Sequence, residues 1–437
     1  MLDQVRQKKV LFATVPADGH FNPLTGLAKY LQQQGWEVKW YTSGLYQAKL
    51  GKLGIPHLPF KKALDANGSN VDSVFPKRTE IKSKIAKLNF DLIHIFSDRA
   101  QEYYEDIREI YRDFRFDLMI ADSVFSAIPI VKAALAVPVV AVGIVPLPEK
   151  SRYLAPYGLG MTPPGNFLQL MKYRLLHLVS HKILFKESIA AYAKALAAHG
   201  VQSNGAQLFD VILKHADLVL QSGSPAFEYR RPDMGRNIEF VGALHPYQAP
   251  EKAAVPEWFN TVLHTYKKIV LVTQGTVEKD YNKLIKPTVD ALKDTDTLVI
   301  VTTGGSNTTF LRARYPYKNV IVEDFVPYDL IMPHVSVFVT NGGYGGVLLS
   351  IKHQLPIVAA GMHEGKNEIC ARVGYFNIGI DLETESPDPV QVREAVQKVI
   401  NDAAYKKHIK AVAADLEQYE PMVLATHHID ALLTATA

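Results

Sequence analysis

The chain has 437 residues, of which 48% are hydrophobic and 21% charged, a composition typical of globular proteins and not of disordered or fibrous ones. This length favours two domains of roughly 200 residues each. The net charge of +4 is small and basic residues alternate with acids, so a nucleic-acid partner is not expected. The single Cys370 excludes an internal disulfide framework and a multi-cysteine metal site, and it is compatible with a cytoplasmic protein.

The first half alternates strand and helix patterns. The run KKVLFATV lacks a cleavage site of small residues, so it is interpreted as a first β-strand and not as a signal peptide. A helix with Leu24, Leu27 and Leu31 on one face and a strand EVKWYT follow. The β-rich runs FDLMIAD and VPVVAVGIV then predict a parallel sheet with crossover helices. Lys132 and several prolines interrupt the longest apolar stretch, residues 127–148, so no membrane-spanning helix and no integral membrane contact are expected.

The second half opens a new α/β unit at KKIVLVTQGT and continues with the strands TLVIV, NVIVE, VSVFV, LPIVA and IGIDL. The proline-rich residues 243–259 show little periodicity and are interpreted as a linker. This gives an N-terminal domain over 1–242 and a C-terminal domain over 260–437, with the last helix a candidate to pack back on the N-terminal domain. Ligands of doubly wound sheets bind outside the carboxyl ends of the strands, so the loops at those ends are the candidate sites.

Two loops of the second half are candidates for phosphate binding. VTNGGYGGV, residues 339–347, places four glycines between a buried strand and a helix whose N-terminus favours an anion by roughly 0.3 to 1 kcal/mol. A tight turn whose glycines serve packing alone is the alternative, because the spacing matches neither the Walker loop nor GxGxxG. The TQGT loop offers Gln274, Gly275 and Thr276 to a phosphate. Phe325 could stack on a nucleobase or belong to the core.

The first half supplies a candidate base. His20 lies in PADGHFNP, just after the first strand and before a helix start. A histidine there can remove a proton from a hydroxyl near neutral pH when a carboxylate orients its ring. Asp122 also ends a predicted parallel strand, so the two side chains could meet above one sheet, whereas helix capping by both is the alternative. DTD at residues 294–296 mimics a metal-binding motif but is interpreted as a helix-to-strand turn, so no metal is expected.

In their order along nearly the entire chain, these motifs resemble the family-1 nucleotide-sugar glycosyltransferases of the GT-B fold. The residues that carry the resemblance are GHFNP, the AD after FDLMI, TQGT, and the segment from DFVPYDLIMPH through VTNGGYGGVLLSIKHQLPIVAAGMHEGKNE to ARV. It implies an α/β protein of two doubly wound, Rossmann-like domains that face each other across a cleft, the first binding the acceptor and the second the nucleotide sugar. It also implies an inverting, metal-independent transfer with His20 as general base and Asp122 orienting it. The donor-binding residues that it implies are Gln274, Gly275, Thr276, Phe325, Val326, Asn341, Gly342, Gly343, Gly345, Gly346, Val347, Glu364 and Lys366.

Departures from the family pattern bear on the donor. Asn341 and Gly346 replace a frequent His and a usual Ser or Thr. Leu349 stands where many relatives carry the acid that holds the ribose hydroxyls, an interaction worth roughly 1.5 to 3 kcal/mol. Its absence weakens selection for ribose and favours deoxythymidine. Gly365 and Lys366 replace the acid–Gln pair that holds glucose hydroxyls, which favours a 6-deoxy sugar.

The expected donor is therefore dTDP-L-rhamnose, and the chain resembles bacterial rhamnosyltransferases that act on flavonoids and similar aromatic acceptors. UDP-glucose, with a macrolide, lipid or phenolic acceptor, is the alternative. The acceptor-binding candidates, each of which could equally be core, are Phe21, Phe125, Met161 and Phe167. The nucleotide sugar is a co-substrate, so no cofactor is expected, and the chain is expected to be a cytoplasmic monomer or weak dimer. A GT-B sugar-nucleotide epimerase and an inactive nucleotide-binding homologue are the rival classes, and the intact His20 and Asp122 argue against the second.

Overall fold

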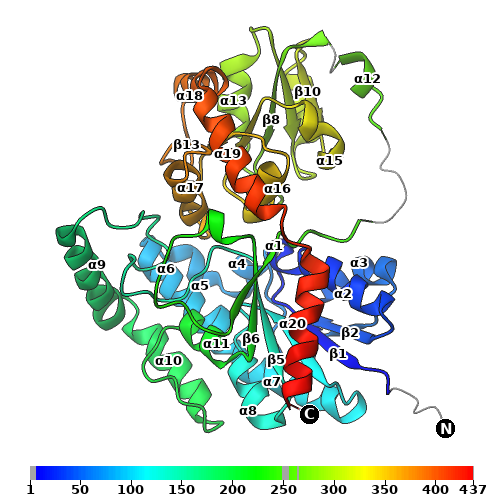
Figure 1. The fold of residues 1–437 in the computed structure, drawn as a ribbon, viewed down its shortest axis with the longest axis vertical. Coiled ribbons are helices and arrows are strands. Elements are labelled where there is room, and N and C mark those ends of the chain that lie inside the picture. Colours follow the sequence, from blue (N-terminus) through cyan, green and yellow to red (C-terminus); the bar gives the residue numbers. More distant parts are fainter. Residues whose placement is uncertain (1–5, 249–254, 263–264, 437) are drawn as a thin grey trace.

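The computed structural model describes residues 6–248, 255–262 and 265–436 and contains two α/β units, one above the other in Figure 1. One is built on a seven-stranded sheet of order β3-β2-β1-β4-β5-β6-β7, and the other on a six-stranded sheet of order β10-β9-β8-β11-β12-β13. Neighbouring strands of both sheets run parallel, which confirms the predicted doubly wound, two-domain α/β fold. Part of the predicted linker, residues 249–254, lies outside the described residues.

The first sheet is buried on both faces by helices, which is why its strands are almost wholly apolar. Its strands are β1 (Lys9–Ala13), β2 (Glu37–Thr42), β3 (His57–Pro59), β4 (Leu118–Asp122), β5 (Val139–Gly143), β6 (Leu218–Ser222) and β7 (Ile238–Gly242). The helices of this unit are α1 (Asp18–Phe21), α2 (Leu24–Gln33), α3 (Gln47–Leu53), α4 (Val71–Val74), α5 (Pro76–Glu80), α6 (Lys84–Asp91), α7 (Arg99–Asp113), α8 (Ile128–Leu135), α9 (Phe167–Val179), α10 (Lys186–Ala197) and α11 (Leu208–His215). Shorter helical turns are η1 (Gly44–Tyr46), the π-helical η2 (Leu92–Ser97) and η3 (Ser180–Leu184), and η4 (Pro225–Phe227).

The apolar stretch 127–148 divides into α8 and β5, as predicted. Within the described ranges, no helix combines the length and the apolar character needed to cross a bilayer.

The second sheet is covered in the same way. Its strands are β8 (Lys268–Thr273), β9 (Thr297–Thr302), β10 (Val320–Glu323), β11 (Val337–Thr340), β12 (Ile357–Ala359) and β13 (Gly379–Asp381). The helices that follow β7 are α12 (Phe259–Val262), α13 (Ile285–Leu292), α14 (Thr308–Arg314), α15 (Tyr328–Ile331), α16 (Tyr344–Lys352), α17 (Lys366–Tyr375), α18 (Pro389–Asn401), α19 (Ala403–Leu416) and α20 (Pro421–Thr436), with the turn η6 (Met332–His334). Although it ends the chain, α20 lies over the N-terminal unit, where Ala425 and Ile429 join the core beneath α2 (Figure 1).

The two units share an interface that fixes their arrangement. Phe227 of the first unit packs in one apolar cluster with Tyr344 and Leu348 of α16. Beside this cluster, the Arg372 guanidinium on α17 donates to the Glu228 carboxylate over 2.6 Å, with both side chains almost fully buried. The carboxyl ends of both sheets therefore face this shared interface.

Candidate active site

A histidine and a carboxylate meet at the head of the first sheet. Since β1 and β4 are hydrogen-bonded neighbours, α1 after β1 and the last residue of β4 lie at the same edge. His20 on α1 has its Nδ1 atom 3.1 Å from Oδ1 of Asp122. The Asp122 side chain is fully buried and also accepts the backbone N–H groups of Val15 and Val124, over 2.9 and 3.1 Å.

These contacts determine which ring atom is available for chemistry. In the neutral His20 ring, the Nδ1–H group donates a hydrogen bond to the Asp122 carboxylate, so the lone pair available for chemistry is on Nε2. The His20 side chain is 22% exposed, whereas Asp122 has no exposure. The pair can thus take a proton from a ligand at the surface and stabilise the resulting imidazolium from beneath.

The glycine-rich loop between β11 and α16 presents bare backbone. Gly342 has a φ of +82°, and a Cβ built there would lie 2.6 Å from Sγ of Cys370, so only glycine suits the position. Gly343 precedes the first residue of α16, and a Cβ on Gly343 or Gly345 would have no atom within 4 Å. The first N–H groups of a nine-residue helix have no partner within the helix, and the bare glycine backbone leaves room beside them for an anion.

The TQGT loop is hydrogen-bonded to the glycine-rich loop through its backbone, whereas the side-chain amide of Gln274 bonds to the start of α13. Nδ2 of Asn341 donates to the carbonyl oxygen of Gln274 over 2.5 Å. The side-chain oxygen of Gln274 accepts the N–H groups of Leu284 and Ile285, over 3.1 and 2.7 Å, where α13 begins. The Gln274 side-chain amide thus holds the start of α13, while the residue also lines the pocket at the ends of β8, β11 and β12, so its contact with a donor stays a prediction. Thr276 remains exposed.

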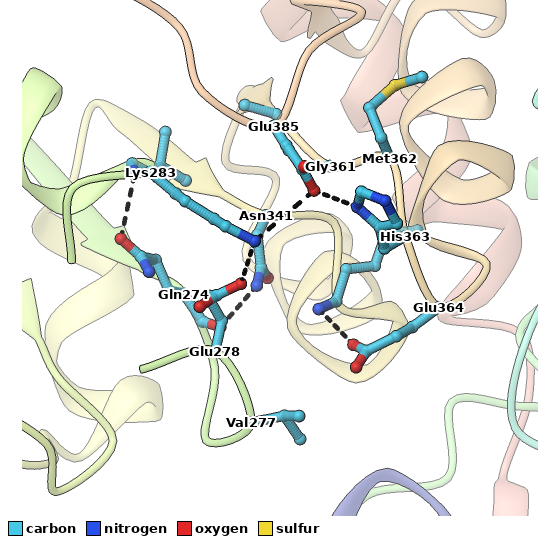
Figure 2. A pocket seen from close by; sticks show the side chains of 13 residues that line it. Gln274, Val277, Glu278, Lys283, Asn341, Gly361, Met362, His363, Glu364 and Glu385 are labelled. Carbon is cyan, nitrogen blue, oxygen red and sulfur yellow. Dashed lines mark hydrogen bonds and ion pairs between the residues drawn. The ribbon is translucent and has the colours of Figure 1, made fainter. Parts of the chain in front are cut away.

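A pocket of about 160 Å³ opens where β8, β11 and β12 end (Figure 2). Figure 2 shows charged side chains converging on it from three loops, and they form pairs. Nζ of Lys283 lies 2.6 Å from Oε2 of Glu278, and Nζ of Lys366 lies 2.7 Å from Oε2 of Glu364. His363 hydrogen-bonds to Glu385. Alternating cations and carboxylates of this kind suit a ligand that carries both hydroxyl groups and a phosphate.

Sequence reasoning placed Glu364 and Lys366 at this site but missed four of the charged residues that line it. The missed residues are Glu278, Lys283, His363 and Glu385. The charge-rich motif HEGKNE was the one signal that could have found His363. Glu278 and Lys283 lie in the loop that the TQGT motif begins, whereas Glu385 comes from a segment about 100 residues later, which only the fold brings beside them.

The apolar donor candidates differ in exposure. The Phe325 side chain is 68% exposed, and its ring lies 3.8 Å from where a Cβ on Gly305 would stand, so it presents a free face. Val326 and Val347 are buried in the cores that flank the second sheet, so only their backbone could reach a ligand. Leu349 is partly buried and packs against the same cluster as Val326.

Two contacts bring the halves of the site together. Oγ1 of Thr276 lies 3.4 Å from Oδ2 of Asp18, which is two residues from His20 on α1. The loop after β5 also crosses to the second unit, where the N–H groups of Gly158 and Gly160 donate to Glu368 on α17, over 2.8 and 2.9 Å. The helix that carries His20 thus lies against the TQGT loop, and Met161 follows a loop bound beside Lys366.

The aromatic acceptor candidates do not gather around His20. Phe21 is buried and stacks on Tyr46 with ring centroids 4.1 Å apart, and Phe125 is buried and stacks on Tyr103 at 4.7 Å. Both belong to the cores of the first sheet, so their predicted place in an open acceptor slot is corrected. Phe167 is 70% exposed at the start of α9.

The DTD residues form the exposed turn between α13 and β9, as predicted. Across the described ranges, no three His, Cys, Asp or Glu side chains are grouped so that they could hold a metal ion.

Comparison with known proteins identifies relatives that align with most of this chain. The profile of the family described as "UDP-glucoronosyl and UDP-glucosyl transferase" matches residues 105–429. The 4'-demethylrebeccamycin synthase of Lentzea aerocolonigenes is 30% identical over 97% of this chain and 99% of its own length. UDP-glucosyltransferase 1 of Beauveria bassiana is 29% identical over 97% of this chain and 94% of its own. Among solved structures, the glycosyltransferase of kitacinnamycin has the same fold, with a TM-score of 0.74 and 18% identity over 98% of this chain and all of that one.

Proposed function

We propose that this chain, which belongs to the UDP-glucuronosyl and UDP-glucosyl transferase family, transfers L-rhamnose from dTDP-L-rhamnose to a hydroxyl of a small aromatic acceptor such as a flavonoid. The observation that carries the proposal is the contact between His20 and Asp122 beside the TQGT loop of the other unit, which is itself hydrogen-bonded to the glycine-rich loop. One unit supplies a base and the other an anion site.

In the proposed reaction, Nε2 of His20 takes the proton of the acceptor hydroxyl as its oxygen forms a bond to the anomeric carbon. The bond from that carbon to the diphosphate oxygen breaks, and its electron pair leaves with the diphosphate. Attack opposite the leaving group inverts the anomeric centre. Asp122 stabilises the imidazolium, and the backbone N–H groups at the start of α16 stabilise the departing diphosphate.

The proposed acceptor side of the cleft uses His20 and the loop that ends at Met161. Phe21 and Phe125 form the core beneath it and do not contact the acceptor. The donor side uses Thr276, the backbone of residues 342–346, the exposed ring of Phe325, and the paired charges of Glu364 and Lys366.

Replacement of His20 tests the base assignment. His20→Ala is expected to lower turnover about 10²- to 10⁴-fold, the usual contribution of a general base, while leaving dTDP affinity within about twofold. The matched control is His94→Ala, which removes an exposed histidine that also pairs with an aspartate, Asp98, at 2.8 Å. Turnover by His20→Ala equal to that of the control would refute the base assignment.

The donor assignment rests on Leu349, which stands where the family resemblance implies an acid that holds the ribose hydroxyls. Calorimetric titration is expected to show tighter binding of dTDP than of UDP, and Leu349→Glu is expected to shift the preference toward UDP. Leu349→Met is the matched control, since it keeps the volume and the apolar character. A clear UDP preference of the unaltered chain would overturn the dTDP assignment.

UDP-glucose is the second candidate donor, because UDP-glucosyltransferase 1 of Beauveria bassiana aligns with nearly the whole chain. Transfer assays with dTDP-L-rhamnose and UDP-glucose, each offered with a generic flavonol, distinguish the two candidates directly.

A further inference from the structure

The outer face of α9 and η3 is apolar and exposed. Its exposed side chains, with their exposed fractions, are Phe167 (70%), Leu168 (78%), Leu175 (60%), Leu178 (55%) and Ile183 (69%). At 3.6 residues per turn, the four that belong to α9 fall within an arc of about 100°. The opposite side of this helix is also used, because Tyr173 is buried there. A helix that is apolar on both sides is normally buried on both, so this outer face is available to a partner.

The same segment concentrates positive charge. From residue 150 to 186 the sequence holds six Lys or Arg and no Asp or Glu, whereas the whole chain holds 48 basic and 44 acidic residues. On the helical wheel, the exposed Lys172 and Arg174 border the apolar arc on its two sides. Within the described residues, Lys172, Arg174 and Lys182 have no carboxylate within ion-pair distance.

A second helix with exposed aliphatic side chains lies beside this segment, on the inner side of α9 (Figure 1). Nδ2 of Asn89 on α6 donates to the carbonyl oxygen of Leu184 in η3 over 2.6 Å, so α6 lies against the end of the segment. Ile85 and Leu88 on α6 are 46% and 47% exposed. Lys82 and Lys84 beside them are exposed as well. In Figure 1, α9 forms the outer edge of the N-terminal unit, with α6 on its inner side.

We propose that the outer surface of α9 and η3 docks on the surface of an anionic lipid bilayer. Its aliphatic side chains would enter the boundary between headgroups and acyl chains, and the flanking Lys and Arg would contact lipid phosphates. Two copies of the chain are a poorer match for this surface, because a symmetric contact would place its basic residues against each other. The bilayer supplies both the apolar layer and the negative charge.

The position of α9 links docking on the bilayer to the entry of the acceptor. The loop of residues 157–161, which five residues separate from the start of α9, is held on α17 beside Lys366 by Asn367 and Glu368. A docked α9 would place the acceptor side of the cleft close to the bilayer. Apolar acceptors that partition into lipid would then reach His20 without crossing bulk water.

Vesicle flotation tests the proposal. The full chain is mixed with vesicles of phosphatidylcholine alone or of equal parts phosphatidylcholine and phosphatidylglycerol. We expect binding to the anionic vesicles and little to the neutral ones. Raising the salt from 0.1 M to 1 M shortens the Debye length from about 10 to about 3 Å, so binding is expected to weaken. Lys172→Glu with Arg174→Glu should lower the partition coefficient about 30-fold or more, and Leu168→Gln with Leu175→Gln about tenfold or more.

Matched controls separate this surface from general effects of charge and apolarity. Lys398→Glu with Lys407→Glu reverses two exposed charges on α18 and α19, and Val390→Gln removes an aliphatic side chain that is 62% exposed on α18. The controls are expected to bind vesicles like the unaltered chain. Circular dichroism checks that every variant is folded.

Three results would overturn the proposal. The first is failure of the unaltered chain to float with anionic vesicles, and the second is equal flotation of the α9 variants and the controls. The third is a concentration-dependent dimer that Leu168→Gln with Leu175→Gln abolishes without changing flotation, which would assign the face to a second copy. Because flotation needs neither donor nor acceptor, its outcome is independent of the proposed transfer reaction.

Discussion

The buried ion cluster between the two units predicts a large effect of a single substitution. Arg372 on α17 donates to Glu228 through Nε and Nη2, over 3.2 and 2.6 Å, and to Glu368 through Nη1 over 3.1 Å. Its guanidinium also lies 4.0 Å from the ring centroid of Tyr229. The side chains of Arg372, Glu228 and Glu368 are 2%, 6% and 6% exposed, so water cannot replace these partners.

Arg372→Met removes the cation and leaves two buried carboxylates, only one of which keeps a second cation, Arg231. Breaking a buried ion pair from one side costs about 3 to 5 kcal/mol, because the remaining charge loses its compensation. Glu368→Gln in the same background removes the buried carboxylate that has no other cation among the described residues. The double variant is therefore expected to recover part of the loss, on the order of 1 to 3 kcal/mol.

The cluster also predicts a dependence on pH. Burial raises the pKa of the Glu228 carboxyl, but Arg372 and Arg231 outweigh burial and hold the pKa below its ordinary value. A lowered carboxyl pKa contributes stability above the pKa of the unfolded chain, about 4.3, and this contribution is lost as the pH falls through the lower pKa of the folded state. In Glu228→Gln this acid-dependent loss should be smaller.

Urea unfolding followed by tryptophan fluorescence measures these changes. Trp36 and Trp40 report on the first unit, and Trp258 packs in the core of the second, so a separation of the units would appear as two transitions. Arg312→Met, which removes a surface pair with Glu323, is the control and should cost about 1 kcal/mol or less. A loss in Arg372→Met no larger than in this control would refute the reasoning, as would the absence of recovery in the double variant.

The remaining predictions concern the glycine-rich loop and a linker histidine. Gly342→Ala should cost roughly 1 to 3 kcal/mol of stability and abolish dTDP binding, because the new Cβ would meet Cys370 at a positive φ. The control Gly343→Ala, whose Cβ would face open space, should stay folded. Equal melting temperatures of the two variants would contradict the argument. Burial lowers the pKa of His245 to about 4, so the unfolded chain binds its proton first as the pH falls, and stability should drop by about 2 kcal/mol between pH 7 and pH 5. In His245→Gln, the urea midpoints at pH 7 and pH 5 should differ less than they do in the unaltered chain. An equal difference in the two proteins would assign the loss of stability to other groups.

The architecture and the position of the candidate site followed from the sequence. Apolar runs located β1, β2, β4 and β5 of the first sheet and all six strands of the second, because such runs are a local property of the chain, but β3, β6 and β7 were not predicted. The ends of β1, β4, β8 and β11 could be located in the same way. Since parallel strands place those ends at one edge of each sheet, the proximity of His20 and Asp122 could be anticipated before any coordinates.

The use of individual side chains was decided by the tertiary structure. A local pattern does not show whether an aromatic ring faces a cleft or a covering helix, so Phe21 and Phe125 were placed at the acceptor although both are buried. Nor does a local pattern show that the side-chain amide of Gln274, a predicted donor contact, also holds the start of α13. Lys283 and Glu385 come together only after about 100 residues of intervening chain have folded. Such contacts depend on which elements pack against each other, and that choice is made by the whole fold.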